Sequence, residues 1–579
     1  MRVSKRLTGL AAISAVTLIA VSACSKQTPS TTPQYSPGFA ECATKPNTCN
    51  NGPTTPGGTL TMAIEKTIPN FNVWDGDGNT YETGQVLSGV LPSAFIINPD
   101  GTLLLNQDLL VSADIANQSP FTVVYKIQPS AVWSDGTPIS ADDFIYAFKI
   151  NNGTDCKDCP VAGTTGYDQV KSVTGSDGGS TVTVVYNDPY ADWKVLFTGT
   201  NALYPSHIAA KAGDLSTAAG LKASYDAFVK DTPSWSGGPY VISDYNKDVS
   251  VTLTPNPKWY GTAKPSLDKV VFKIIEDQAQ EAPALKNDEV QALISQPNAD
   301  IVSAVKGIEG VNYNLTKGPT WEHIDLNFKN KWLADKALRQ AIFTAIDRTA
   351  IISKTVGPFF DGAAPLNNHN IMPGQPGYQD VITATGQGAG NIDAAKKILT
   401  DAGYTIADNA LKTKSGETVP PLRFGFTNGN TLREATGEVV QNELTQLGIQ
   451  VTLDPFKSLG QTLSTGDFDM IIYAWVGSPF LLGAPDQWST DGGSDYNHYS
   501  NPQVDDLMKQ VKTTIDYNQV YQLLNQADAL MAADASVLPL YQKPVFLAVN
   551  SKFVNIRNNA NLDGPAYDIQ EWGLKAGTS

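Results

Sequence analysis

The central part of the chain alternates between helical and strand-like patterns. Residues 335–346, 391–402 and 433–447 place apolar side chains at helical spacing, and the last two segments end just before a glycine, which is a common helix stop. Residues 449–453 and 470–474 are short apolar runs that are typical of strands. Helices that alternate with strands over this length predict α/β lobes, because each face of a sheet needs helices to cover it.

Chain length and charge limit the class of protein further. The chain has 579 residues, which is too long for one simple core, so we expect two or three lobes. In the N-terminal half, residues 59–64, 121–127 and 180–186 alternate like strands, and residues 140–148 read as a helix capped by Ser140. The 57 acidic and 41 basic side chains leave a net charge of −16. This charge argues against a nucleic-acid partner, whose binders need a basic face.

The first residues have the pattern of an export signal. Arg2, Lys5 and Arg6 give a positive start, and residues 7–21 are almost wholly apolar. This run is shorter than the about 20 apolar residues that span a bilayer. It therefore fits the apolar region of a secretory signal better than a permanent membrane span.

The apolar run ends at Cys24, which is followed by polar, proline-rich chain. Residues 21–24 (VSAC) resemble the lipobox of bacterial lipoproteins. That resemblance implies that residues 1–23 are a signal peptide, and that a lipid on Cys24 anchors the protein outside the cytoplasm at the cell membrane, since two or more acyl chains anchor stably. The alternative is an ordinary secretory signal with a chance cysteine. Residues 24–57 lack apolar periodicity and are expected to form a flexible tether.

Four further cysteines form an even set. Outside the cytoplasm such a set predicts disulfides, and closeness in sequence suggests Cys42–Cys49 and Cys156–Cys159. A redox pair is an alternative for Cys156 and Cys159, but the following Pro160 and glycines do not resemble a helix start. A zinc site is a second alternative, although the spacing of Cys42 and Cys49 does not match that of the other pair.

Sequence motifs for catalysis are absent. The chain has no Walker A motif, no Gly-x-Ser-x-Gly and no His-Glu-x-x-His, and its four histidines are far apart. Adjacent acids such as Asp142 and Asp143 stand at helix starts, where the helix dipole explains them. We therefore expect no enzyme activity, no cofactor and no metal site.

A set of short phrases occurs in order along most of the chain. The phrases are 132–144 (VWSDGTPISADDF), 237–240 (GGPY), 256–261 (NPKWYG), 338–348 (LRQAIFTAIDR), 395–404 (AKKILTDAGY), 447–449 (LGI), 466–469 (GDFD) with Trp475, and 499–502 (YSNP) with Asp505. Each phrase alone is weak, but the ordered set resembles the family 5 extracellular solute-binding proteins, the oligopeptide- and dipeptide-binding type. The Asp-Gly turn, the capped helix and the adjacent Asp347 and Arg348, which we expect to form an ion pair, are structural features in this reading.

The resemblance implies a fold of the type II periplasmic-binding-protein kind, with two hinged α/β lobes and an extra lobe. Such a molecule closes around its ligand, since closure is driven by differential affinity. It would capture short peptides as a monomer and deliver them to an ABC permease that a separate ATPase powers. The expected divisions are residues 58–90, 237–315 and 530–579 for lobe I, 91–236 for the extra lobe II, and 316–529 for lobe III.

The ligand site is expected near Trp475, at a strand end before a loop rich in Pro and Gly. In the family an acid in this loop pairs with the peptide α-amine, because a buried unpaired ammonium is costly. Ser478 stands where that acid is expected, and the next acid is Asp486. Core or surface roles are the alternatives for each candidate. The further candidate ligand-binding residues are Tyr473, His498, His323, Trp74 and Trp235.

Other functions remain open on the sequence. Members of the family take nickel chelates, haem, sugars or opines, so a non-peptide solute is one alternative. Envelope lipoproteins of the same fold act in cell-wall glycolipid synthesis, which is a second alternative. A wall-modifying enzyme is a third, and it would need the catalytic set that the chain lacks.

Overall fold

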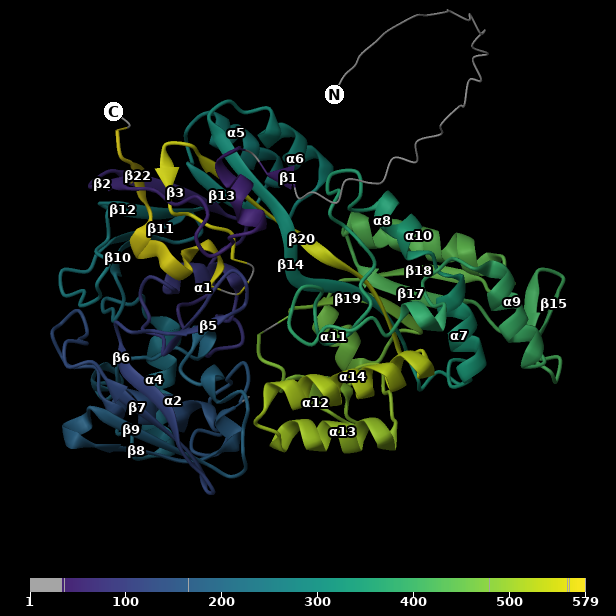
Figure 1. The fold of residues 1–579 in the computed structure, drawn as a ribbon, viewed down its shortest axis with the longest axis horizontal. Helices are drawn as coiled ribbons and strands as arrows, with labels where there is room; N and C mark the ends of the chain where they lie inside the picture. Colours follow the sequence, from purple (N-terminus) through teal and green to yellow (C-terminus); the bar gives the residue numbers. More distant parts are fainter. Residues whose placement is uncertain are drawn as a thin grey trace, which may run out of the picture.

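The computed structural model describes residues 34–35, 37–164, 166–477, 479–559, 561 and 563–577. Cys24 and Ser478 lie outside these ranges. One large mixed sheet runs through the molecule in the order β10-β11-β12-β3-β13-β20-β14-β19-β17-β18, with β1 (Gln34–Tyr35) paired to β14. Lobe I occupies the upper left of Figure 1, lobe II the lower left and lobe III the right-hand side.

Two long strands connect lobe I with lobe III. β14 (Val311–Leu326) and β20 (Val537–Asn550) pair antiparallel and cross the molecule diagonally (Figure 1). Their register is interrupted between Lys317 and Trp321. On one side of this interruption β20 pairs with β13 of lobe I, and on the other side β14 pairs with β19 of lobe III. The interruption therefore lies where the two lobes meet, as expected for a hinge.

In lobe I, the parallel strands β3 and β13 form the centre of this half of the sheet, and the other strands flank them. β3 pairs in parallel with β12 on one side and with β13 on the other. The carboxyl ends of these strands therefore reach the same edge of the sheet. The elements are β3 (Thr59–Ile64), α1 (Tyr81–Leu87), β10 (Tyr240–Asn246), β11 (Ser250–Pro255), β12 (Lys269–Ile274), α5 (Glu281–Lys286), β13 (Ala292–Ser295), α6 (Ala299–Lys306), β2 (Thr54–Thr55), β21 (Phe553–Val554) and β22 (Gly573–Lys575).

The expected tether is wrong over its C-terminal part. Residues 37–43 form a short 3-10 helix that contacts β14, and Phe39 is fully buried. Thr54–Thr55 pairs with β22. Although this segment is mostly polar, a few buried apolar side chains and a disulfide attach it to lobe I.

Lobe II is built on a four-stranded antiparallel sheet covered by helices. Its α2 begins at a capping box. The Ser140 hydroxyl accepts a hydrogen bond from a main-chain amide of the first turn, and the Asp143 carboxylate accepts one from the Ser140 amide. The Asp143 carboxylate also accepts a hydrogen bond from Nε1 of the buried Trp133, at 3.2 Å. The elements are β4 (Phe95–Ile97), β5 (Leu103–Leu105), β6 (Leu110–Gln118), β7 (Phe121–Ile127), α2 (Ala141–Asn151), β8 (Val170–Ser176), β9 (Thr181–Tyr186), α3 (Ser206–Ala209) and α4 (Ala218–Lys230).

Lobe III surrounds its half of the sheet with helices. The expected boundary at residue 530 falls inside α14, which contacts α13 and α7 of lobe III, so the chain returns to lobe I only through β20. The helix and strand expectations from 335 to 474 match elements here, with ends that differ by at most three residues. The elements are α7 (Lys336–Ala345), α8 (Arg348–Lys354), α9 (Ile392–Asp401), β15 (Thr405–Ala407), β16 (Ala410–Lys412), β17 (Leu422–Thr427), α10 (Thr431–Thr445), β18 (Val451–Phe456), α11 (Leu459–Thr465), β19 (Met470–Trp475), α12 (Ala484–Trp488), α13 (Pro502–Thr513) and α14 (Tyr517–Asp534).

The expected ion pair between Asp347 and Arg348 is wrong. Asp347 caps α8 by accepting hydrogen bonds from the amides of Thr349 and Ala350. The Arg348 guanidinium instead donates to main-chain oxygens of distant segments, including Pro539 at 3.0 Å. The side chains of Asp347 and Arg348 therefore have different partners, and Arg348 links α8 to β20.

Candidate binding cleft

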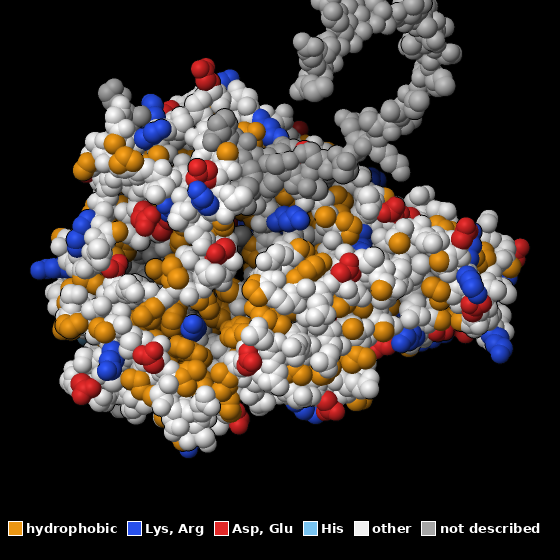
Figure 2. All heavy atoms as spheres, in the orientation of Figure 1, with side chains coloured by type: hydrophobic (Ala, Val, Ile, Leu, Met, Phe, Trp, Pro, Cys, Tyr) orange, Lys and Arg blue, Asp and Glu red, His pale blue; other side chains and the backbone are white. Residues whose placement is uncertain are grey.

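Three adjoining cavities follow the boundary between the lobes. Their volumes are about 260, 240 and 400 Å³. Val476 borders the first and second cavities, and Pro544 borders the second and third. Figure 2 shows hydrophobic side chains gathered around a hollow where the two halves of this face meet. We call the three together the interlobe cleft.

The first cavity, here the aromatic cavity, lies between lobe II and the end of β19. Its wall includes Trp475, Trp321 and His369 from lobe III and Val195 from lobe II. The half-buried Trp475 ring stacks on Tyr496, with ring centres 6.0 Å apart and an interplanar angle of 15°. Its Nε1 is buried without a hydrogen-bond partner. The predicted cleft wall at Trp475 therefore has the geometry to contact a ligand.

A buried polar pair supports Trp475 from behind. His323 is fully buried, and its ring lies parallel to that of Trp475 with centres 6.1 Å apart. Its Nδ1 lies 2.7 Å from an Asp325 oxygen, and the Tyr473 hydroxyl donates to the other oxygen at 2.9 Å. Neither His323 nor Tyr473 lines the cavity. We therefore assign both residues to orienting the tryptophan.

His369 was not among the sequence candidates, and it lines the aromatic cavity. Its Nδ1 contacts Asp528, and Nε2 lies 2.9 Å from the main-chain oxygen of Val537. Burial lowers the pKa of His369, but the adjacent Asp528 outweighs burial and holds the pKa above its ordinary value. The ring is thereby fixed in the wall of the cavity.

The second cavity, here the acidic cavity, lies at the carboxyl end of β3. Glu65 follows β3 directly, and its Oε1 accepts hydrogen bonds from Ser295 Oγ at 3.1 Å and the Gln296 amide at 2.9 Å. Burial raises the pKa of Glu65 above its ordinary value. α1 adds Tyr81, Glu82 and Gln85 to the wall, and Lys66, Thr320 and Val545 also border it.

The third cavity, here the ion-pair cavity, lies between lobe I and the start of α10. Glu322 is 3% exposed and accepts three hydrogen bonds from Arg433, two at 3.1 Å and one at 3.4 Å, while Lys543 Nζ lies 3.5 Å away. Burial raises the pKa of Glu322, but Lys543 and Arg433 outweigh it, so the pKa lies below its ordinary value. Asn430, the N-cap of α10, borders the same space.

The structure places the other candidates away from these cavities. Trp74 and Trp235 are buried among aromatic rings of lobe II, each within 5.5 Å of the Tyr204 ring centre. Asp486 is exposed and accepts hydrogen bonds from the Gly493 amide and the Ser494 hydroxyl, so its carboxylate stabilises a loop. His498 lies beside Gly466 and borders none of the three cavities.

Sequence reasoning missed Glu65, Gln85, His369 and Lys543. A signal existed for Glu65, because an acid directly after the first predicted strand stands at the carboxyl end of that strand, where ligand sites of α/β sheets gather. The other three residues come from segments whose meeting depends on long-range strand pairing. No local pattern marks them.

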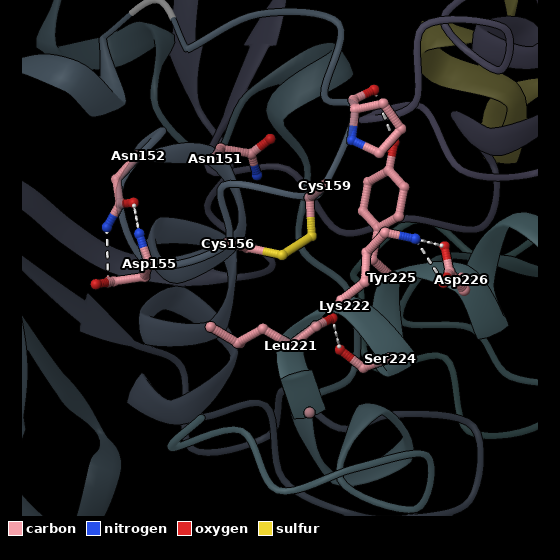
Figure 3. Close-up of a disulfide and its surroundings, with 12 residues drawn as sticks. Asn151, Asn152, Asp155, Cys156, Cys159, Leu221, Lys222, Ser224, Tyr225 and Asp226 are labelled. Carbon is pink, nitrogen blue, oxygen red and sulfur yellow. Dashed lines mark hydrogen bonds and ion pairs between the residues drawn. A yellow bond between two sulfur atoms is a disulfide. The ribbon is translucent and has the colours of Figure 1, made fainter. Parts of the chain in front are cut away.

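The structure contains the disulfides Cys42–Cys49 and Cys156–Cys159. Figure 3 shows the Cys156–Cys159 disulfide beside α4. Nearby, the Asn152 side-chain amide donates a hydrogen bond to the Asp155 carboxylate. Both of its cysteines are buried. Among the described residues, no three His, Cys, Asp or Glu side chains are arranged to hold a metal ion. Within the same residues, no helix is both long and apolar enough to cross a bilayer.

Comparison with known proteins agrees with this architecture. The model of the bacterial extracellular solute-binding proteins, family 5 Middle, matches residues 113–495. The oligopeptide-binding protein OppA of Mycobacterium tuberculosis is 32% identical over 508 residues, which cover 86% of this chain and 82% of that protein. The protein named "Probable monoacyl phosphatidylinositol tetramannoside-binding protein LpqW", also of M. tuberculosis, is 27% identical over 406 residues, covering 68% of this chain and 59% of that protein.

Two solved structures show the same fold. The periplasmic EDTA-binding protein EppA superposes with a TM-score of 0.86 at 34% identity, covering 92% of this chain and 99% of that chain. The oligopeptide-binding protein AppA from Bacillus subtilis, in complex with a nonapeptide, gives a TM-score of 0.70 at 22% identity, with 90% and 100% coverage. The chain therefore belongs to the family 5 bacterial extracellular solute-binding proteins and has the type II periplasmic-binding-protein fold.

Proposed function

We propose that this protein is a lipid-anchored, extracytoplasmic solute-binding protein that captures short peptides and delivers them to an ABC permease. One observation carries the proposal: three adjoining cavities form an elongated cleft whose walls come from all three lobes. An extended chain molecule fits such a row of cavities better than a compact solute does. The likeness to OppA supports the peptide assignment.

The mode of action follows from the hinge. Lobes I and III are joined by β14 and β20, so a ligand that contacts both lobes favours the closed arrangement. Val476 is 57% exposed and borders two of the cavities, and a ligand there would bury an apolar side chain. The protein acts in this scheme by binding, and the permease and its ATPase move the cargo.

Thermal melting against a peptide library tests the proposal. A peptide that binds only the folded chain at 100 times its dissociation constant adds about 2.7 kcal/mol to the free energy of unfolding. Trp475→Ala should reduce the melting shift, because it removes a wall of the aromatic cavity. Trp332→Ala is the matched control, since Trp332 stands in lobe III beside Lys331 and borders none of the three cavities. Equal loss of the shift in both variants would contradict the assigned wall.

A non-peptide solute is the second candidate. The ion-pair cavity combines Lys543 with the N-terminus of the 15-residue α10, and both features attract an anion such as a polycarboxylate. The similarity to the periplasmic EDTA-binding protein EppA also supports a polycarboxylate ligand. A melting shift with a metal–EDTA chelate and none with any peptide would favour this candidate. A shift with a mannosylated phosphatidylinositol alone would favour the envelope role.

The lipid anchor has its own test. Cys24→Ala should release the protein from the membrane fraction, because the acylated residue is lost. Cys42→Ala is the control, since it changes a cysteine that a disulfide holds. If the Cys24→Ala variant stays in the membrane fraction, the anchor proposal fails.

A further inference from the structure

The acidic cavity presents more hydrogen-bond acceptors than its surroundings satisfy. Gln85 is 1% exposed and lines the cavity, and its Oε1 has no hydrogen-bond partner. Glu82, one turn away on the same helix, is 4% exposed; its carboxylate accepts no hydrogen bond from the described residues, and its oxygens are not among the fully buried unpartnered atoms. A buried acceptor without a donor, such as the Gln85 oxygen, costs about 1–3 kcal/mol, so a donor from outside the chain is favoured here.

Glu65 brings a third acceptor to the same space. Its Oε1 is occupied by Ser295, Gln296 and a long contact to Gln278, while Oε2 accepts no hydrogen bond from the described residues. Because β3 and β13 are parallel, their carboxyl ends hold Glu65 and Ser295 side by side at the edge of the cavity. The free oxygen therefore stands at a rigid position.

A third acid lies behind this edge. Glu281 is 1% exposed, its Oε2 has no partner, and burial together with the nearby Glu65 raises the pKa of Glu281 to about 8. Lys66 borders the cavity with an exposed side chain, and its charge lowers the pKa of Glu65 without outweighing burial. In the described part of the chain it forms no ion pair with Glu65 or Glu82 within 4.0 Å. In the wall of the cavity one exposed cation, Lys66, therefore stands against the two acids Glu65 and Glu82.

We propose that the acidic cavity binds a primary ammonium group of the ligand, with Glu82, Gln85 and Glu65 as its acceptors. An ammonium group has three donors and no acceptor, which matches a site made of oxygens. Hydrogen bonds between opposite charges are about twice as strong as neutral ones. Thr320 and Val476 of lobe III border the same cavity, so the bound group would lie between the two lobes. The inference rests on the proposed peptide capture, and the ammonium can come from the peptide N-terminus or from a lysine side chain.

Four tetrapeptides separate these two sources by isothermal titration calorimetry of the full chain. They are tetra-alanine, acetylated tetra-alanine, and acetylated peptides with lysine or norleucine at the second position. The acetylated peptides without lysine should bind about tenfold to a hundredfold more weakly than tetra-alanine, as expected for the loss of a charged hydrogen bond. Recovery with lysine assigns the side chain, and no recovery assigns the α-amine. Equal affinity for all four peptides overturns the inference.

Variants test the residues. Glu82→Gln should weaken binding of the ammonium-bearing peptide by about tenfold or more and leave binding of the acetylated peptides without lysine unchanged. Thr320→Lys should have the same selective effect, since it adds a positive charge from the lobe III side without disturbing α1. Glu289→Gln is the matched control, because Glu289 pairs with Lys273 in lobe I outside the cavity. An equal effect of Glu82→Gln and Thr320→Lys on both peptides overturns the inference.

Failure of peptide capture is distinguishable from failure of this inference. If no peptide binds the wild-type chain, 1,5-diaminopentane is the probe in thermal melting. Stabilisation of the wild type that is lost in Thr320→Lys would support the ammonium site while the peptide proposal fails. Absence of stabilisation at millimolar concentration would overturn the ammonium site as well.

Discussion

The buried cluster around Glu322 offers the sharpest stability prediction. Glu322 is 3% exposed, and it faces Arg433 at 3.1 Å and Lys543 at 3.5 Å. Glu322→Gln leaves two cations near each other without their shared counter-charge. Breaking a buried ion pair by removing one partner costs about 3–5 kcal/mol of unfolding free energy. We expect the upper part of this range, because two cations lose the same carboxylate.

Urea unfolding followed by circular dichroism measures the effect. The midpoint should fall while the slope stays unchanged, which marks a change in stability alone. The double variant Glu322→Gln/Arg433→Met should be less destabilised than the sum of the single variants, by about 1–3 kcal/mol, because the two side chains share one network. Lys397→Gln is the control: its pair with Asp401 is 74% and 64% exposed, and such pairs contribute about 0.3–0.5 kcal/mol.

The pH dependence provides a second check. The folded chain lowers the pKa of Glu322, so its contribution is present above the ordinary pKa of 4.5 and is lost as pH falls through the folded value. Glu322→Gln should therefore show a weaker fall in stability with acid than the wild type. Additive single effects, or an unchanged acid profile, would refute the reasoning that the cluster is a coupled buried charge network.

Three further predictions concern other parts of the molecule. Asp192 of lobe II accepts hydrogen bonds from Tyr517 and the Leu482 amide of lobe III. Burial raises the pKa of Asp192 from 3.8 to about 6, so the folded chain favours the protonated over the ionised carboxyl by about 3 kcal/mol more than the unfolded chain does. The contact should therefore be most favourable below pH 4 and weaken as pH rises through 6; X-ray scattering should show a larger radius of gyration at pH 7.5 than at pH 5, and Asp192→Asn should abolish that difference. Gly477→Ala places a Cβ 2.5 Å from the Pro319 main-chain oxygen, so the loop that carries Val476 must move; we expect weaker ligand binding with a small change in melting temperature, and unchanged affinity would contradict it. Trp133→Ala removes a fully buried ring and should cost about 3–5 kcal/mol in urea unfolding, whereas a loss below 1 kcal/mol would show that lobe II does not depend on it.

Much of the fold is readable from local pattern. The segment 59–64 alternates because Leu60, Met62 and Ile64 all pack into one core, and Ser140 with Asp143 marks the start of α2 through capping chemistry. These features act over a few residues, so the sequence displays them directly. Trp475 could also be predicted as a wall of the cleft, because a strand end before a Pro- and Gly-rich loop is itself a local pattern.

Composition predicted local structure poorly where a few buried side chains hold a mostly polar segment in place. Residues 37–57 contain many polar residues and prolines, which predict a tether, but the buried Phe39 and the Cys42–Cys49 bond attach them to the globule. Trp74 was predicted to line the cleft from its residue type, and it lies in an aromatic core instead. Residue type does not distinguish a core ring from an exposed one.

By itself, the sequence determined the α/β class, the family phrases, the helix starts and the acid balance, since each depends on neighbours within a few positions. Only the tertiary structure decided which side chains share a cavity. Glu65 meets Ser295 across 230 positions through the parallel pairing of β3 and β13, and Glu322 of β14 meets Arg433 across 111 because α10 packs on the same sheet. Strand pairing is set by burial of whole faces against distant segments, so no local pattern specifies the contents of the cleft.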